Sequence, residues 1–212
     1  MAIAPARHPI TMSRSGFIMD YARQMLRSTG DADMIILDSD ASVFAMLYLD
    51  VVEHAAGDRV LLVPSLFGYP PYQRWLARRN PGLNIPPEFT MDWTQWARLN
   101  ASRGLCAEAE SWNELRGSDV QGFFLKGPFP GSAPSGVLIR ASAQAPEPQA
   151  LRSGIERLLE WHAVSHADLY PFSPEMELVN TYRLMLNWGL QSLPSGVDPD
   201  LTEKLQKRLN ES

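Results

Sequence analysis

The sequence predicts an α/β protein, a Rossmann-like three-layer domain with a mainly parallel sheet, followed by a small helical appendage at the C-terminal end. Residues 34–37 form a short continuous apolar run, which is typical of a strand buried on both faces in a parallel sheet. A helical pattern follows over residues 40–52, and a second apolar run occupies residues 60–63. These three segments form a β-α-β unit, whose two strands are expected to be parallel.

Breaks in composition divide the chain into three parts. Residues 1–12 contain two prolines and no periodicity, so we expect a disordered leader. A polar, proline-containing linker occupies residues 142–148. We therefore expect an α/β domain over residues 13–147 and a helical segment over residues 148–212.

The first half of the chain shows helical and strand patterns in alternation. Apolar residues at helical spacing predict a helix from Ser15 that ends at Gly30. In the helix after the first strand, the apolar positions from Val43 to Val52 are expected to pack back on that strand. A proline- and aromatic-rich loop at 64–71 is expected to lead into another helix. A short strand at 83–85 and a helix capped by Thr90, which carries Trp93 and Trp96, are expected next.

The second half is expected to complete the sheet and then to become helical. The patterns predict a helix over 106–115 and strands over 120–125 and 136–141. The connection 126–135 lacks both GxxxxGK[ST] and GxGxxG, so its glycines are interpreted as turn formers. Three further helices are expected, one around Ile155 and two that begin at Ser173-Pro174 and at Asp198-Pro199.

Composition excludes several functional classes. The chain has 45% hydrophobic and 20% charged residues and a net charge of −5, and no segment forms the basic face that nucleic acid requires. No apolar run approaches the roughly 20 residues of a membrane-spanning helix. The single cysteine, Cys106, excludes an intramolecular disulfide. No motif has the ligand spacing of a structural zinc site, and we expect no bound metal or other cofactor.

The acidic turn Asp38-Ser39-Asp40 is the main candidate site. It lies between the first strand and its helix, at the sheet edge where open α/β sheets bind ligands. Asp40 is expected to be the N-cap of the helix, which leaves Asp38 for a ligand. Alternatively, the turn matches the Asp-x-Asp pattern with which nucleotide-sugar glycosyltransferases hold a divalent cation against a diphosphate. Of the two, the turn-plus-cap interpretation is favoured.

Further candidate ligand-binding residues lie at the ends of the next strands. Ser65, Phe67 and Tyr69 follow the second strand and are expected at the same sheet edge as Asp38. Their aromatic rings are expected to cover the sheet, or else to form a wall that suits a sugar. Arg140 ends the last apolar strand, where it can bind an anion or form an ion pair with the central aspartates.

Three stretches together resemble a known family. They are Phe17–Leu26, then Asp38-Ser39-Asp40 followed by Tyr48-Leu49 and Asp58-Arg59-Val60, and then Gly136–Arg140. In this order they are similar to the soluble C-terminal region of polytopic membrane glycosyltransferases of the GT-C-like, protein O-mannosyltransferase-like family of unknown function. The likeness covers residues 14–141. The family pattern has glycine at Leu37, asparagine at Ser39 and an aromatic residue at Ile139, so the chain departs from it at these three positions.

The resemblance implies a function without catalysis. In GT-C enzymes the catalytic acid lies in an early membrane-proximal loop, which belongs to the membrane half. The chain is therefore expected to be a non-catalytic, extracytoplasmic (periplasmic) module whose partner is the membrane-embedded half of its parent or another membrane protein, with a glycan or acceptor as possible ligand. Two alternatives remain, a stand-alone, cytoplasmic, metal-dependent nucleotide-sugar glycosyltransferase that uses the acidic turn, and a structural interaction module.

Overall fold

The computed structural model describes most of the chain. The described residues are 12–84, 96–97, 99–116, 132–141, 146–161, 173–193 and 198–211. The expected strand at 120–125 and the expected cap at Thr90 with Trp93 lie outside these ranges, as does most of the expected leader.

A five-stranded sheet with the order β2-β1-β3-β5-β4 forms the centre of the molecule. The strands are β1 (Met34–Ile36), β2 (Val60–Leu62), β3 (Leu105–Ala107), β4 (Ala133–Ser135) and β5 (Leu138–Arg140). Strand β1 pairs in parallel with β2 and β3, whereas β5 pairs antiparallel with β3 and β4. The α/β class and the parallel β1-α2-β2 unit are confirmed. The sheet is mixed rather than mainly parallel, because a β4–β5 hairpin forms one edge.

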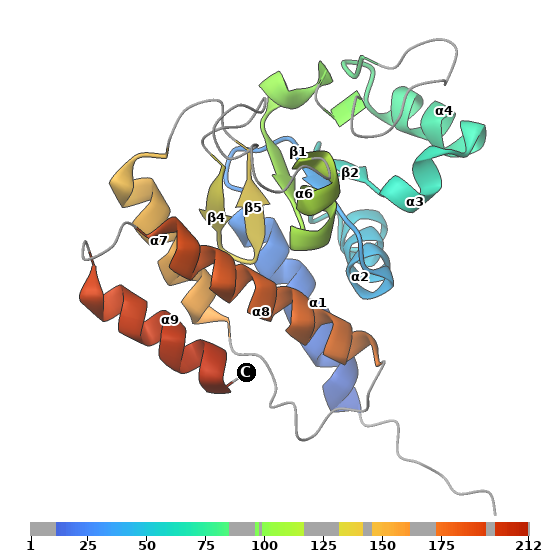
Figure 1. Ribbon diagram of the computed structural model, residues 1–212. Helices are drawn as coiled ribbons and strands as arrows, with labels where there is room; N and C mark the ends of the chain where they lie inside the picture. The colour runs from blue at the N-terminus through green and yellow to red at the C-terminus, as the bar shows by residue number, and fades with distance from the viewer. Residues whose placement is uncertain are drawn as a thin grey trace, which may run out of the picture.

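Helices surround this sheet. They are α1 (Met12–Ser28), α2 (Asp40–Val51), α3 (Pro64–Phe67), α4 (Pro70–Arg79), α6 (Ala109–Arg116), α7 (Pro148–Glu160), α8 (Pro174–Ser192) and α9 (Pro199–Glu211). Figure 1 shows α8 running across α1 and beside α2, with α9 along its outer side. Buried side chains of α7, α8 and α9 belong to the same core cluster as those of the sheet.

Two strands were missed by the sequence patterns. Strand β3 begins the segment 106–115 that was expected to be entirely helical, and β4 lies within the connection 126–135. Each strand has only three residues and lacks a run of β-branched or aromatic side chains, so neither periodicity nor composition marks it. In contrast, the expected N-terminal signals of α8 and α9 are confirmed. Ser173 Oγ accepts the Met176 amide, and Asp198 Oδ1 accepts the Leu201 amide.

The prediction of which residues in and just after α2 are buried is wrong at four positions. Phe44, Tyr48, Val51 and Val52 are exposed, with 71% of Phe44 accessible to solvent. The residues buried in this helix are Ala41, Ser42, Val43, Ala45, Met46, Leu49 and Asp50. Helix α2 contacts α1 and α8, so packing against neighbouring helices decides which of its apolar stripes is covered.

Helix α7 approaches the edge of the sheet very closely. A Cβ atom at Gly154 would lie 2.0 Å from the backbone oxygen of Pro134 in β4. The Gly154 carbonyl accepts a hydrogen bond of 2.9 Å from the amide of Gly136, in the turn of the β4–β5 hairpin. This backbone contact requires glycine, since any side chain would push α7 away from the hairpin.

Candidate functional site

The acidic turn lies at a topological switch point of the sheet. The chain leaves β1 through α2 to reach β2 on one side, and β3 later pairs with β1 on the other side. Asp38 follows the carboxyl end of β1, and Glu108 directly follows the carboxyl end of β3. In open α/β sheets, ligands bind outside the carboxyl ends of strands at such a point.

Glu108 fills the space between these two strand ends. Its Oε2 atom accepts hydrogen bonds from the Asp38 amide at 2.6 Å, the Ser39 amide at 3.3 Å and the Ser42 hydroxyl at 2.6 Å. Only 1% of Glu108 is exposed. The carboxylate thus occupies the N-terminal end of α2, where backbone amides attract an anion.

The sequence contains a pattern that indicates the position of Glu108, but the helical interpretation of residues 106–115 concealed it. Glu108 follows a short apolar segment, Leu105-Cys106-Ala107, just as Asp38 follows the apolar run of β1. An acidic residue after an apolar run suggests a strand end. Because residues 106–115 also fit a helical pattern, the position was not recognised as one.

The environment of Glu108 favours its neutral form. Burial raises its pKa from 4.5 to about 7, against the opposing effect of the Asp38 amide, the Ser42 hydroxyl and the Ser39 amide, which stabilise the charged form. The Tyr21 side chain of α1 is also fully buried, and burial followed by the nearby Glu108 carboxylate raises the Tyr21 pKa well above 10. The protonation state of Glu108 therefore changes near neutral pH.

Ser39, rather than Asp40, is the N-cap of α2. The Ser39 Oγ atom accepts the Ser42 amide at 3.0 Å, in the geometry of an N-cap side chain. Asp40 is the first residue of the helix and is exposed. The expectation that Asp40 would be the cap is therefore wrong. Ser39 can accept the amide three residues onward, and Asp40 is left to face solvent.

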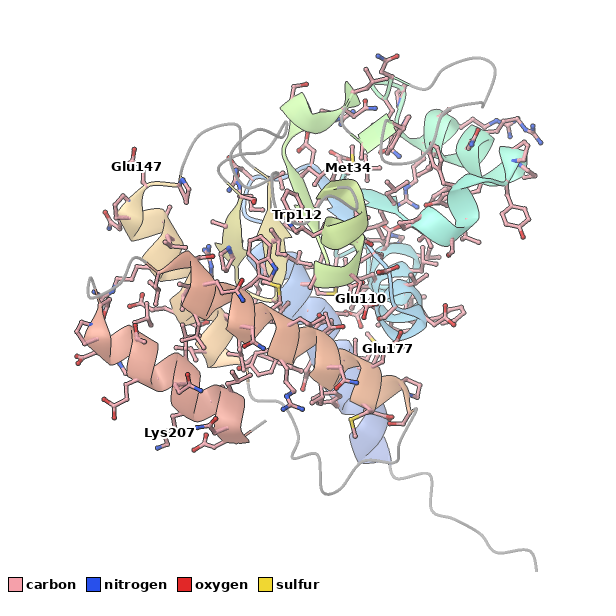
Figure 2. All side chains as sticks on the ribbon, viewed as in Figure 1. Met34, Glu110, Trp112, Glu147, Glu177 and Lys207 are labelled. Carbon is pink, nitrogen blue, oxygen red and sulfur yellow. The ribbon has the colours of Figure 1, made fainter. Side chains whose placement is uncertain are left out.

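Several carboxylates gather around this turn. Burial, followed by the negative charges of Glu110, Asp40 and Asp38, raises the pKa of Glu177. Figure 2 shows Glu110 on α6 and Glu177 on α8 close to each other. Within the described ranges, no group of three or more His, Cys, Asp or Glu side chains is arranged to hold a metal ion.

An apolar groove with a volume of about 540 Å³ begins at Asp40. Its described lining residues come from α1, α2 and the start of α8. They are Ile18, Met19, Asp40, Ala41, Phe44, Ala45, Tyr48 and Pro174. The acidic turn thus lies beside an aromatic wall, but the rings of this wall come from α2.

The aromatic segment after β2 has a different position from the groove. Ser65 and Phe67 lie in α3, and Phe67 is buried with its ring 5.4 Å from that of Trp96. Tyr69 precedes α4 and is 62% exposed. None of the three is among the described residues that line the groove.

Arg140 lies at the opposite end of the sheet from Asp38. Its Cα pairs with that of Cys106, and its guanidinium forms an ion pair with Asp31, which precedes β1. Asp38 instead follows the carboxyl end of β1. The structure therefore does not bring Arg140 and the acidic turn together.

Comparison of the chain with models of protein families, with curated proteins and with solved structures found no match. No helix in the described part of the chain is both long enough and apolar enough to cross a membrane. The function proposed below is therefore supported by the geometry of the described residues and by the sequence resemblance.

Proposed function

We propose that the chain is a non-catalytic, extracytoplasmic binding module of a membrane-bound glycosyltransferase. In this proposal, the groove between α1 and α2 holds an amphipathic, basic helix of the membrane-embedded half or of a membrane partner. The glycosyltransferase context is supported by the sequence resemblance. The observation that carries the binding function is the apolar groove that ends at a group of carboxylates.

The apolar side chains of α2 support a protein as the occupant. Phe44 and Tyr48 line the groove and are 71% and 48% exposed, and Val51 and Val52 continue the apolar surface along the helix. Amphipathic helices bind such grooves with apolar residues at successive turns. A helix is favoured over a glycan because most of the described lining is aliphatic or aromatic.

Charge complementarity indicates how that helix would lie. Asp40 lines one end of the groove, and its negative charge reaches Glu177, as does that of Glu110. None of these three carboxylates forms an ion pair with a described lysine, arginine or histidine. A partner helix with basic residues at one end would neutralise this group and fix its direction in the groove.

The position of Glu108 supports a role without catalysis. In an enzyme that binds a nucleotide sugar on a Rossmann-like sheet, the diphosphate approaches the switch point and the N-terminus of the adjoining helix. Here the Glu108 carboxylate already accepts the Asp38 and Ser39 amides at that place. A bound diphosphate would have to displace the Glu108 side chain from these amides.

Peptide binding tests the groove directly. The probe is a fluorescein-labelled helical peptide with leucines at positions i, i+3, i+4 and i+7 and lysines at one end, and its binding is measured by fluorescence anisotropy. Phe44→Ser should weaken binding by about tenfold or more, because the binding free energy loses roughly 1.5–3 kcal/mol from burial of the apolar side chain. Tyr69→Ser, which removes an exposed aromatic residue outside the groove, should leave the affinity unchanged.

Three results would contradict the proposal. They are equal loss of affinity in Phe44→Ser and Tyr69→Ser, equal binding of a twin peptide whose lysines are replaced by glutamate, and absence of any peptide binding.

The alternative function, a nucleotide-sugar glycosyltransferase, is tested by calorimetric titration with Mn²⁺ and nucleotide sugars. Heat that disappears in Asp38→Asn would instead support a metal and nucleotide-sugar site at the acidic turn.

The membrane context needs a test in cells. With a photo-crosslinking amino acid at position 48, the chain should be linked to peptides of a polytopic membrane glycosyltransferase, identified by mass spectrometry. The same amino acid at position 69 is the control. Crosslinks from position 48 to other proteins alone would contradict the glycosyltransferase context.

A further inference from the structure

A second pocket lies at the other end of the sheet, between the β4–β5 hairpin and the start of α7. Its volume is about 250 Å³. The described lining residues are Ala133, Pro134, Ser135 and Arg140 of the hairpin, Pro146, and Ala150 and Arg157 of α7. Two of the seven are arginines, in a chain whose net charge is −5.

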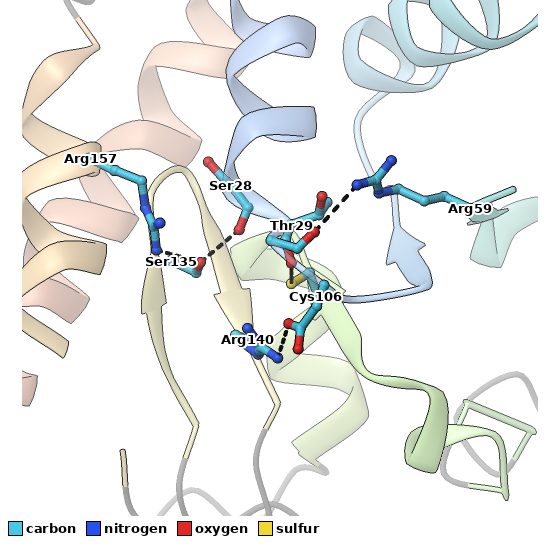
Figure 3. A network of polar contacts seen from close by, with 9 residues as sticks. Ser28, Thr29, Arg59, Cys106, Ser135, Arg140 and Arg157 are labelled. Carbon is cyan, nitrogen blue, oxygen red and sulfur yellow. Dashed lines mark hydrogen bonds and ion pairs between the residues drawn. The ribbon is translucent and has the colours of Figure 1, made fainter. Parts of the chain in front are cut away.

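Strand register places three of the four described hairpin residues of this pocket on one face. Ala133 and Ser135 are two residues apart in β4 and therefore point to the same side. Arg140 pairs directly with Ala133 across the hairpin, so its side chain shares that side. Figure 3 shows Arg157 reaching from α7 toward Ser135, with Arg140 at the far end of β5.

Arg157 is only partly satisfied by its neighbours. Its Nη2 atom lies 3.4 Å from Ser135 Oγ, while that hydroxyl donates its own proton to the Ser28 carbonyl at 2.6 Å. The Nε atom of Arg157 is buried and has no hydrogen-bond acceptor among the described residues. Nor does any described carboxylate form an ion pair with Arg157. A neutral hydroxyl cannot balance a guanidinium charge, and an anion would.

Arg140 adds a second positive charge to the pocket. Its guanidinium forms an ion pair with Asp31, whose side chain is 80% exposed. The described lining of the pocket contains these two guanidinium groups and no carboxylate, because Asp31 and Glu147 lie outside it.

The start of α7 also borders this pocket, through Pro146 and Ala150. Glu147 precedes the helix without making a side-chain cap, and Pro148 at the first position has no N–H group. The next amides, up to Ala150 in the pocket lining, have no partner within the helix. Together with the helix dipole, these amides favour a negative charge here.

We propose that this pocket binds a phosphoryl group, either as free phosphate or as a phosphate monoester. The donors come from three directions, namely Arg140 from the hairpin, Arg157 from the last turn of α7 and the amides from its first turn. This arrangement suits a tetrahedral dianion better than a planar carboxylate. The site is separate from the groove between α1 and α2, so it does not depend on the proposed partner.

Titration with inorganic phosphate, followed by ¹H–¹⁵N NMR on the full chain, tests the proposal. The Arg157 Nε–Hε signal and the Ala150 amide should shift together and saturate. Arg157→Gln and Arg140→Gln should each weaken binding at least about tenfold, because each removes charge-assisted hydrogen bonds. Arg152→Gln is the matched control on the same helix, since Arg152 pairs with Glu156 and Asp198 and does not line the pocket.

Further titrations, with different phosphate compounds, identify the source of the phosphoryl group. Tighter binding of glucose 1-phosphate than of inorganic phosphate would assign a phosphate monoester, and the reverse order would assign free phosphate. Arg157→Lys keeps the charge and should bind more tightly than Arg157→Gln, which excludes a simple folding defect. The proposal is overturned if millimolar phosphate leaves the Arg157 and Ala150 signals unshifted, if acetate binds equally well, or if Arg157→Gln behaves like Arg152→Gln.

Discussion

Replacing Glu108 by glutamine should remove a specific pH dependence of stability. The pKa of Glu108 is raised from 4.5 to about 7, mainly by burial, so the folded state holds its proton more tightly than the unfolded state. The stabilising contribution is fully present below pH 4.5 and is lost as pH rises through about 7. A difference of about 2.5 pKa units corresponds to a loss of about 3 kcal/mol of unfolding free energy.

The variant Glu108→Gln isolates this effect. Glutamine does not titrate, and its carbonyl oxygen can still accept the Asp38 amide or the Ser42 hydroxyl. Urea unfolding followed by tryptophan fluorescence at pH 5, 6, 7 and 8 gives the free energy of each protein. Between pH 5 and pH 8, the wild-type protein should lose about 2–3 kcal/mol relative to the variant.

A matched control and a direct titration complete this test. Glu203→Gln changes an exposed carboxylate on α9 and should follow the wild-type pH dependence. The ¹³C signal of the Glu108 carboxyl group should titrate near pH 7. Parallel stability curves for wild type and Glu108→Gln, within about 0.5 kcal/mol, would refute the conclusion that burial governs this carboxyl group.

Three further predictions concern the cap, the helix–sheet contact and the cysteine. Ser39→Ala should lower the unfolding free energy by about 1 kcal/mol in urea titrations, and Asp40→Asn should lower it less, because Ser39 makes the capping bond. Gly154→Ala should cost about 1–3 kcal/mol because its Cβ would meet the β4 backbone, whereas Gly16→Ala, in open space on α1, should stabilise by about 0.5–1 kcal/mol. Burial raises the pKa of Cys106 to about 12, so its thiol should resist a thiol reagent at pH 8 until denaturant is added.

Each of these has an outcome that would contradict it. A larger loss in Asp40→Asn than in Ser39→Ala would return the capping role to Asp40. Equal stability of the two glycine variants would show that α7 can move away from the hairpin without cost. Rapid labelling of Cys106 under native conditions would mean that the start of the β3–α6 segment opens readily.

The two ends of the sheet are expected to differ in anion binding. At the carboxyl end, the amides at the start of α2 are occupied by the chain's own Glu108. At the other end, the described lining of the pocket beside α7 contains Arg140 and Arg157 and no carboxylate. Measurements of anion binding should therefore locate the response at α7 and not at the acidic turn.

The sequence by itself determined the local elements around the first crossover. Continuous apolar runs predicted β1 and β2, and their parallel pairing followed from the intervening helix. Ser173-Pro174 and Asp198-Pro199 marked the starts of α8 and α9, because capping depends on residues within one turn. Such signals are readable because every interacting group lies close in the chain.

Only the tertiary structure decided where the chemistry lies. Glu108 meets the Asp38 amide across 70 residues of chain, and Arg140 pairs with Asp31 across 109, so no local pattern predicts either contact. Helix α2 has more apolar residues than one face can hold, and packing against α1 and α8 leaves Phe44 exposed in the groove. Local residue patterns set the helices and the two strands that lie within longer apolar runs, β1 and β2. The groups that face each other depend on how distant segments pack into one core.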